Sequence, residues 1–429
     1  METRTRMDVQ SVSELDPAER RALFERDAGL EEIRDDVAEI VHRVREEGDV
    51  ALREYCRKFD DVEVGNFDIT DEAERAYESI DDDVREAIET AADNIREFHE
   101  HQVREDWSYE TEGRELGRRF YPLDSAGVYA PGGTAAYPSS ALMGIVPATV
   151  AGVDHVVAVT PPAEQINPVT LAAIHAGGAD AVYQVGGAQA IGAMAYGTES
   201  IDSVDVIVGP GNRWVTAAKA EVRGDVKIDM LAGPSEVLVL ADGTADPERL
   251  GAEMIAQAEH DPHAAVVTVT DDVDLAEAVV EEIDAQAGER EREDIIREAL
   301  ANEASGVFVA RSMSEAALFA DQFAPEHIYV EADDEDALLD RIENYGSAFL
   351  GPHSPVAAGD YASGTNHVLP TDAQARLASG LSVDTFVRSA TVQRLSEDGL
   401  AELRETITTL ADREGLEAHA HSVDVRFDE

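Results

Sequence analysis

The sequence predicts an α/β protein with two Rossmann-like units, each built on a mostly parallel sheet, and with helical segments at both ends of the chain. Down to about residue 351, short apolar runs alternate with helical patterns. Most of these runs are continuously apolar, as in strands of a sheet that is covered on both faces. The length of 429 residues also exceeds what one hydrophobic core supports.

The expected elements follow one another in a clear order. From about residue 14 to 101, apolar residues recur at helical spacing, for example in "DDDVREAIETAADNIREF". Around "WSYETEGRELGRRFYPL" the period falls to two, which predicts a hairpin. Strands are then expected at AGVYA, HVVAVT, AVYQVG, VDVIVG, EVLVLA, AAVVTVT, GVFVA, HIYVE and SAFLG. The end of the chain is predicted to be helical, because Leu400, Leu403, Ile407 and Leu410 have helical spacing.

These elements predict five segments. We expect an N-terminal arm at residues 1–24 and a helical segment at 25–104 that packs against the second α/β unit. The first α/β unit should span 105–235 and the second 236–380, followed by a helical tail at 381–429.

Acidic residues dominate the composition, with 90 Asp and Glu against 34 Lys and Arg and a formal net charge of −56. Such a surface repels phosphate backbones, which argues against a nucleic-acid partner. Repulsion among the carboxylates must also be screened by salt for the fold to persist. The acids are spread over periodic helices, so the composition indicates a salt-adapted globular protein and not a disordered one.

The sequence also bounds the cellular setting. Its longest apolar run, Ala141 to Val153, is interrupted by Pro147 and is too short for a membrane span. The N-terminal residues contain no apolar segment of the secretion type, and the single Cys56 excludes an intrachain disulfide framework. A cytoplasmic protein is expected.

Two proton-transfer groups, Glu326 and His327, are neighbours in "FAPEHIYVE". Adjacent side chains diverge in a strand or a helix, so we expect a loop that lets both face one cavity. The alternative is a solvated turn in which Pro325 ends a helix.

Other candidate ligands lie at helix ends and in one long loop. A helix capped by Asp246 should carry Gln257 and His260 on one face of its last turn, where both could reach one cation. In the alternative interpretation, His260 donates a hydrogen bond to the free backbone carbonyl groups at the helix end.

The turn-rich segment 351–371 contains His353, Asp360 and His367, and the chain ends with Glu414, His419 and His421 in "EGLEAHAHSV". Long loops of this kind usually carry function. A packed surface loop and a solvated helix end are the alternatives.

Glycine-rich turns follow three expected strands, in "APGGTAAYPSS", "VGGAQAIG" and "VGPGN". Each could bring backbone amides close to phosphate at a helix N-terminus. None is a complete dinucleotide fingerprint, because Trp214 replaces the third glycine of GxGxxG and no convincing acidic residue follows.

Taken together and in this order, the motifs resemble the histidinol dehydrogenase family over about residues 25 to 427. They are YAPGG, VGGAQAI, GPGN, AGPSEVLV, QAEH, PEH, GDYASGTNHVLPT and EGLEAH. The resemblance implies an NAD-dependent enzyme with zinc, or manganese, as its metal. The implied metal ligands are Gln257, His260, Asp360 and His419. The implied substrate contacts are these ligands with Ser235, His327, His367 and Glu414. The implied NAD contacts are Tyr129, Gln189 and Asn212.

The resemblance also implies a reaction, the oxidation of L-histidinol to L-histidine through a bound aldehyde at the end of histidine synthesis. His327, with a near-neutral pKa, is expected to remove the alcohol proton, and Glu326 to activate the water that hydrates the aldehyde. A homodimer is implied, in which the tail with Glu414 and His419 completes the site of the partner.

Three other functions compete with this interpretation. A related enzyme could oxidise another primary alcohol, such as a sulfonated diol, although such a substrate would not need both Glu414 and His367. A zinc hydrolase could use Glu326 to activate water, but the glycine-rich turns and Tyr129 count against it. A binding protein without catalysis would have no use for the whole polar set.

Overall fold

The structure is a computed structural model that describes residues 7–26, 29–132 and 137–427. The chain forms two compact units. The first comprises the residues up to Gln102 together with Leu123–Phe386, and the second comprises Val103–Pro122 together with the residues from Val387 onward. None of the helices in these described ranges combines the length and the apolar character that crossing a bilayer requires.

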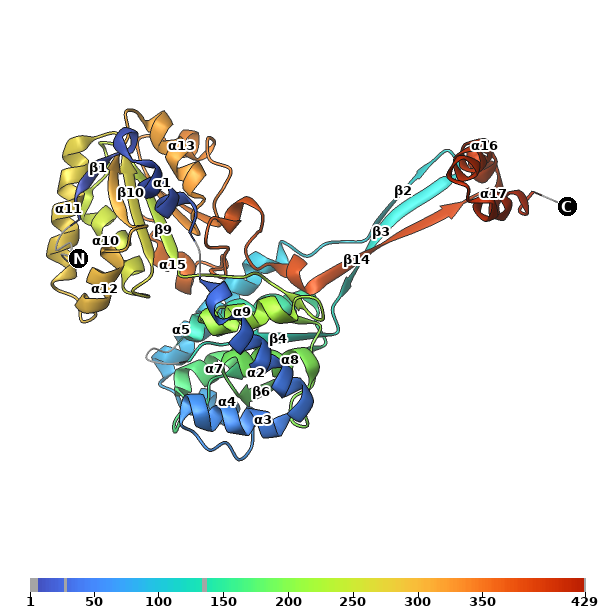
Figure 1. Ribbon diagram of the computed structural model, residues 1–429, viewed down its shortest axis with the longest axis horizontal. Helices are drawn as coiled ribbons and strands as arrows, with labels where there is room; N and C mark the ends of the chain where they lie inside the picture. Colours follow the sequence, from blue (N-terminus) through green and yellow to red (C-terminus); the bar gives the residue numbers. More distant parts are fainter. Residues whose placement is uncertain (1–6, 27–28, 133–136, 428–429) are drawn as a thin grey trace. The chain divides into compact units, whose positions relative to one another are not determined.

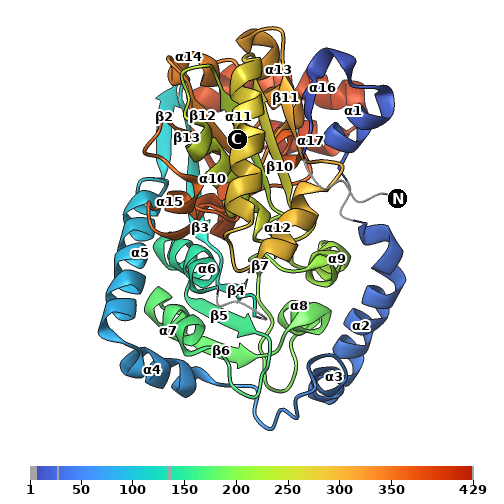
Figure 2. The same cartoon turned by 90° about the vertical axis from the view of Figure 1, so that its left-hand side faces the viewer.

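The first unit contains a five-stranded parallel sheet in the order β6-β5-β4-β7-β8. Its strands are β4 (Ser125–Tyr129), β5 (His155–Thr160), β6 (Ala181–Gln184), β7 (Val206–Val208) and β8 (Lys227–Ile228). One face is covered by α4 (Thr70–Ser79), α5 (Asp82–Glu100), α6 (Pro138–Ala151) and α7 (Pro168–Gly177). The other is covered by α2 (Arg34–Glu47), α3 (Asp49–Tyr55), α8 (Gly187–Tyr196) and α9 (Arg213–Val222) (Figure 2).

Close packing explains why small residues recur in this layer. A side chain at Gly144 of α6 would meet Val128 Cγ1 of β4 at 2.4 Å, so the helix can approach the sheet only with glycine there. Pro147 lies inside the same helix, which ends at Gly152 with a φ of 83°. Most of the apolar run Ala141–Val153 therefore lies in a core helix, α6, which ends at Ala151.

The first unit also contains a six-stranded parallel sheet in the order β1-β11-β10-β9-β12-β13. Its strands are β1 (Val9–Ser11), β9 (Glu236–Ala241), β10 (Ala265–Thr270), β11 (Gly306–Val309), β12 (His327–Glu331) and β13 (Ser347–Leu350). One face packs on α10 (Pro247–Ala258), α11 (Val273–Ala287) and α12 (Glu293–Leu300). The other packs on α1 (Pro17–Phe24), α13 (Met313–Phe323) and α14 (Glu335–Leu339), and α15 (Val356–Tyr361) follows β13 (Figure 1).

Both sheets repeat one strand order. Leaving aside β1, each runs third, second, first, fourth, fifth in chain order, so the chain reverses direction across the sheet between the first and fourth strands. In such sheets the crevice beside this reversal point, outside the carboxyl ends of the strands, is the usual place for a ligand. The predicted class of two Rossmann-like units, and all nine predicted strands, are confirmed.

The structure corrects two expectations about the segments and adds detail to a third. The helices α2 to α5 pack on the first sheet, and not on the second unit, because their apolar faces enter the cores around β4 and β7. The N-terminal arm is part of the second sheet, since β1 pairs in parallel with β11. The hairpin around Trp107 belongs to the second compact unit, and not to the first α/β unit.

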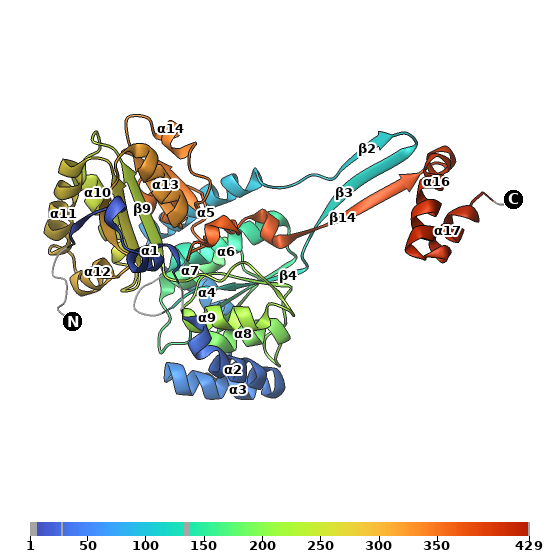
Figure 3. The same ribbon diagram turned by 45° about the horizontal axis from the view of Figure 1, so that its top comes forward.

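The second compact unit is a three-stranded antiparallel ribbon that carries two helices. The strands lie in the order β14-β3-β2, with β2 at Trp107–Thr111, β3 at Arg114–Pro122 and β14 at Val387–Leu395. The helices α16 (Glu397–Glu414) and α17 (Glu417–Asp424) lie at one end of this ribbon (Figure 3). The strand β14 interrupts the segment 381–429, so its α-helices lie only between Glu397 and Asp424 and the tail is not helical throughout as expected.

Short helical turns complete the described chain. They are η1 (Val12–Glu14), η2 (Leu30–Ile33), η3 (Cys56–Asp60), η4 (Gln374–Arg376) and η5 (Val383–Phe386).

Candidate active site

The predicted catalytic and metal-binding residues of the first unit gather at the amino ends of β9 and β12. These are neighbouring strands at the reversal point of the second sheet. Glu326 directly precedes β12 and His327 is its first residue, while Ser235 directly precedes β9 and is half-buried. The candidate site therefore uses the opposite end of this sheet from the one that open α/β sheets usually use.

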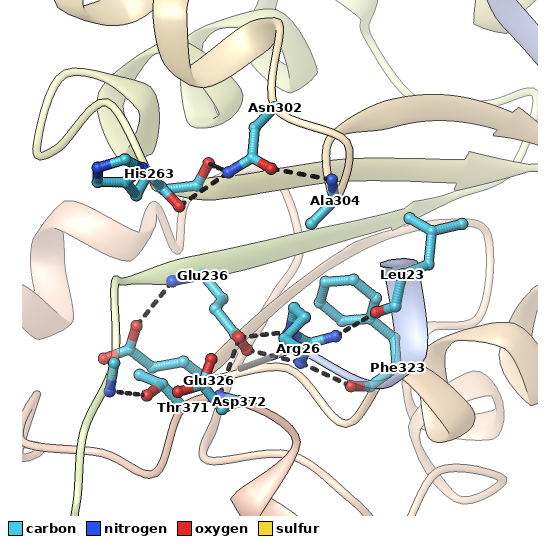
Figure 4. A network of polar contacts seen from close by, with 12 residues as sticks. Leu23, Arg26, Glu236, His263, Asn302, Ala304, Phe323, Glu326, Thr371 and Asp372 are labelled. Carbon is cyan, nitrogen blue, oxygen red and sulfur yellow. Dashed lines mark hydrogen bonds and ion pairs between the residues drawn. The ribbon is translucent and has the colours of Figure 1, made fainter. Parts of the chain in front are cut away.

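Glu326 and His327 are both held by the backbone of Glu236. Glu326 Oε2 accepts a hydrogen bond from the Glu236 N–H at 2.8 Å (Figure 4). His327 Nδ1 lies 3.2 Å from the Glu236 carbonyl oxygen, which can only accept, so Nδ1 carries the proton in this bond. The Nε2 atom of a neutral His327 is then free of a proton and lies 3.6 Å from Asp360 Oδ1. The expectation of a loop is wrong for His327, because the two side chains converge across the start of a strand.

Burial changes the acid–base properties of the pair. It lowers the pKa of His327 to about 3, with the nearby His367 and His260 acting in the same direction. It raises the pKa of Glu326 well above its usual value, and the nearby carboxyl groups of Glu236 and Asp360 raise it further. The near-neutral pKa expected for His327 is therefore not found. The imidazole is neutral at neutral pH, with its single proton on Nδ1, while Glu326 is a stronger base than a free carboxylate.

Asp360 and His367 extend this polar cluster. His367 Nδ1 donates to the Asp360 carbonyl oxygen at 2.8 Å and lies 4.0 Å from Asp360 Oδ1. Its Nε2 faces the Ser140 hydroxyl at 3.1 Å, which fixes the ring at both nitrogens. Burial raises the pKa of Asp360 to about 7 and lowers that of His367 to about 4. The site thus combines a desolvated carboxyl group with neutral imidazoles.

The proposed metal ligands of this unit fit a divalent cation. Gln257 is buried, and its Nε2 atom has no hydrogen-bond partner among the described residues. With the amide group turned by 180°, its oxygen would take this position and could serve as a metal ligand. A cation would also relieve the desolvated Asp360 carboxylate. Amide oxygen, imidazole and carboxylate form a mixed N/O set that suits zinc or manganese.

Two details of the expected metal site need correction or completion. The helix α10 ends at Ala258, and not beyond His260, which lies in the following turn with its N–H 3.2 Å from the Gln257 carbonyl oxygen. Within the described ranges, no three His, Cys, Asp or Glu side chains converge as metal ligands. Of the predicted metal ligands in the first unit, only His260 and Asp360 are of these residue types, because Gln257 is an amide. Glu414 and His419 lie on α16 and α17 of the second unit, where both are exposed.

The predicted NAD contacts lie near the carboxyl ends of the first sheet. Tyr129 ends β4, and its hydroxyl accepts a hydrogen bond from the Gly187 N–H at 3.1 Å. Gln189 lies in the first turn of α8, and Asn212 caps α9. Tyr129 and Gln189 are buried, whereas Asn212 is exposed. The turn "APGGTAAYPSS" includes residues 133–136, which lie outside the described residues.

The turn after β7 is tightly built. Gly209 has a φ of 109°, and a side chain there would meet the Tyr129 carbonyl oxygen at 2.3 Å. Asp229 Oδ2 accepts from the Gly209 N–H at 2.8 Å, and Lys219 Nζ donates to the Gly209 carbonyl oxygen at 2.9 Å. Lys219 and Asp229 are themselves a buried ion pair with a 2.5 Å separation. Only glycine fits this position, which places the turn against β4 at the reversal point.

Sequence reasoning missed three residues of the site: Glu236, Arg26 and Ser140. Glu236 carried a signal, because a charged residue begins the otherwise apolar run "EVLVLA". A charge at the start of a buried strand needs a partner. Nothing in the sequence around Arg26 or Ser140 indicated that these residues belong to the site.

Comparison with known proteins decides the family. The family model described as "Histidinol dehydrogenase" matches residues 24–427. The chain belongs to the histidinol dehydrogenase family. It is 69% identical to the histidinol dehydrogenase of Haloarcula marismortui, over 98% of this chain and 100% of that protein. It is 66% identical to the histidinol dehydrogenase of Natronomonas pharaonis, over 98% of this chain and 100% of that protein.

A solved histidinol dehydrogenase supports the same assignment. The crystal structure of the Elizabethkingia anophelis enzyme superimposes with a TM-score of 0.93 at 37% identity, over 98% of each chain. The resemblance read from the motifs is thus confirmed. Membership of the histidinol dehydrogenase family makes the chain an oxidoreductase, and it sets aside the hydrolase and the non-catalytic binding protein.

Proposed function

We propose that the chain oxidises L-histidinol to L-histidine through bound L-histidinaldehyde, with NAD as oxidant and zinc as its metal, in the last steps of histidine biosynthesis. The observation that carries this proposal is the convergence of Glu326, His327 and Asp360 at the amino ends of β9 and β12. The buried Gln257 amide, whose Nε2 has no hydrogen-bond partner among the described residues, adds a further metal-ligand type. A proton acceptor, a second base and metal-ligand types thereby lie within reach of one small substrate.

The metal would be held by Gln257, His260 and Asp360, with His419 supplied by the partner subunit. Zinc, when bound, supplies a Lewis acid that holds and orients nitrogen atoms of the substrate. Desolvation of Asp360 supports this role, because a carboxylate with a pKa raised to about 7 gains most from a nearby cation.

The residues of the chain divide the proton transfers. His327 is fixed with Nδ1 protonated, so Nε2 is the atom that accepts the alcohol proton as the first hydride leaves. The raised pKa of Glu326 makes this carboxylate the base that removes a proton from the water adding to the aldehyde. His367, held between Ser140 and Asp360, would position the substrate together with Ser235 and with Glu414 of the partner.

NAD would bind at the carboxyl ends of the strands of the first sheet, near Tyr129, Gln189 and Asn212. Support comes from the turn at Gly209, which lies at the reversal point and leads into the N-terminus of α9. Exposed Asn212 is placed for direct contact, whereas buried Tyr129 and Gln189 would shape the adjoining turns.

The active form would be a homodimer whose sites are completed across the interface. The second unit supports this, because none of the residues of β2, β3 and β14 is buried within it. Its exposed side chains include Trp107 and Tyr109, which are each about half exposed and stack on one another. A ribbon with exposed aromatic residues is typical of a surface that another chain covers.

One assay tests the proposed reaction. The purified protein, with histidinol, NAD and salt, should form two NADH for each histidine produced. A matched reaction with another primary alcohol should give none. Turnover of the other alcohol without turnover of histidinol would replace this proposal by the related dehydrogenase.

A further inference from the structure

A buried ion pair lies directly behind the proposed catalytic residues. Arg26 Nε lies 2.6 Å from Glu236 Oε1 and Arg26 Nη2 lies 2.9 Å from Glu236 Oε2, so the contact is bidentate (Figure 4). The two side chains are only 6% and 2% exposed. Each ion therefore lost its hydration on folding, and replacing such pairs with apolar residues is often neutral for stability or stabilising. Stability alone does not explain why the pair is present.

The pair binds the segments that carry Glu326 and His327. Glu236 donates its N–H to Glu326 and accepts from His327 through its carbonyl oxygen. Its side chain is fixed by Arg26 and by the N–H of Asp372 at 2.9 Å. The position of this one residue therefore determines where both proposed bases lie.

Arg26 also holds the chain just before Glu326. Its Nη2 donates to the Phe323 carbonyl oxygen at 2.9 Å, and its guanidinium lies 3.9 Å from the centroid of the Phe323 ring. Its Nη1 donates to the Leu23 carbonyl oxygen at 2.6 Å, which ties the guanidinium to the end of α1. One planar group thus links the N-terminal segment, the end of α13 and the start of β9 (Figure 4). Lysine cannot replace Arg26, because an ammonium group cannot make two parallel hydrogen bonds to one carboxylate.

We propose that Arg26 and Glu236 are positioning residues that hold Glu326 and His327 in catalytic register through the backbone of Glu236. This inference rests on the proposed catalytic roles of Glu326 and His327. It adds a function for the N-terminal segment, whose Arg26 acts on the chemistry without touching the substrate.

The test is a double-mutant comparison on the aldehyde step, with supplied histidinaldehyde, saturating NAD and verified metal content. Arg26→Met should lower kcat roughly 10- to 100-fold, since small misplacements of catalytic groups cost about this much, with KM little changed. In a Glu326→Gln background the same substitution should lower kcat by no more than about 3-fold, because the base that Arg26 positions is already gone. A purely structural role would give equal factors in both backgrounds.

Arg249→Met is the control for loss of an Arg–Glu pair on the same strand, although the Arg249 side chain is 43% exposed and that of Arg26 only 6%. Arg249 pairs with Glu331 at the other end of β12, with Nε 3.2 Å from Oε2. Its loss should lower the unfolding midpoint and leave kcat within about 3-fold of the parent.

The outcomes separate the inference from the proposed function. Equal losses in both backgrounds, or a parental kcat for folded Arg26→Met, would overturn the positioning role. A parental aldehyde rate for Glu326→Gln alone would instead refute the proposed base. If Arg26→Met does not fold, Arg26→Lys is used instead, because lysine keeps the positive charge without the bidentate contact. The fold-changes in kcat that it causes in the parental and Glu326→Gln backgrounds are compared in the same way.

Discussion

Replacement of Glu326 by glutamine separates the chemical role of this residue from its structural role. Glu326 Oε2 accepts the Glu236 N–H at 2.8 Å, and the amide oxygen of glutamine can accept the same bond. Retention of this bond should keep the change in unfolding free energy below about 1 kcal/mol. The substitution also removes a buried carboxyl group whose pKa is raised, which lessens the desolvation cost.

The expected loss of activity is much larger than the loss of stability. A general base contributes typically about 10²- to 10⁴-fold, so Glu326→Gln should slow conversion of supplied histidinaldehyde by a factor in this range. Overall conversion of histidinol should fall by a similar factor, because it includes the same hydration step. His327→Ala should instead slow the alcohol step more than the aldehyde step.

The pH dependence gives a second measure of the same residue. Only the deprotonated Glu326 can act as a base, and burial raises its pKa above the usual value. The parental aldehyde rate should therefore rise with pH through this raised pKa, and the rise should be lost in Glu326→Gln.

The assay records NADH formation by both variants with both substrates, at saturating NAD and with bound zinc confirmed by metal analysis. If Glu326→Gln converts the aldehyde at the parental rate, Glu326 is not the base that activates water.

Three further predictions follow from the same structure. Zinc affinity of the apoprotein should fall as pH drops below about 7, because protons compete for Asp360, whose pKa is raised to about 7; a pH-independent affinity would remove Asp360 from the ligand set. Mixing inactive His327→Ala and His419→Ala chains should restore part of the activity if sites are shared, and proven subunit exchange without activity would contradict the shared site. Lowering KCl should lower the thermal midpoint, because a net charge of −56 is then less screened; an unchanged midpoint would argue against salt adaptation.

The sequence predicted the two sheets well because both of their faces are covered. In runs such as "EVLVLA" and "AAVVTVT", apolar residues occupy both alternating sets of positions, because alternate residues enter different cores. The missed strands lack this signal. β1 and β8 have three and two residues, and β14 is mostly exposed along its length. β1 and β8 were therefore missed because they are short, and β14 because it is mostly exposed.

Packing partners could not be predicted in the same way. The apolar stripe of α5 shows that the helix is covered on one side, but Ile88 and Ile95 would fit either sheet equally well. Which core receives them depends on contacts between residues far apart in the chain.

The candidate site was predicted by family motifs more than by geometry. The pairing of Glu326 with His327 was visible, whereas their common attachment to Glu236 depends on the register of β12 against β9. The pKa values were also outside the reach of the sequence, because the desolvation that lowers the pKa of His327 to about 3 comes from the folded surroundings.

The exposed three-stranded ribbon has a consequence for local stability. Strands that bury little of their own surface gain little from folding alone, so their amide hydrogens should exchange far sooner than those of the two covered sheets. If a second copy covers the ribbon, this exchange becomes dependent on protein concentration, because dissociation precedes opening. Slow exchange in β9 and β12 at every concentration, beside concentration-dependent exchange in β3 and β14, would be the corresponding signature.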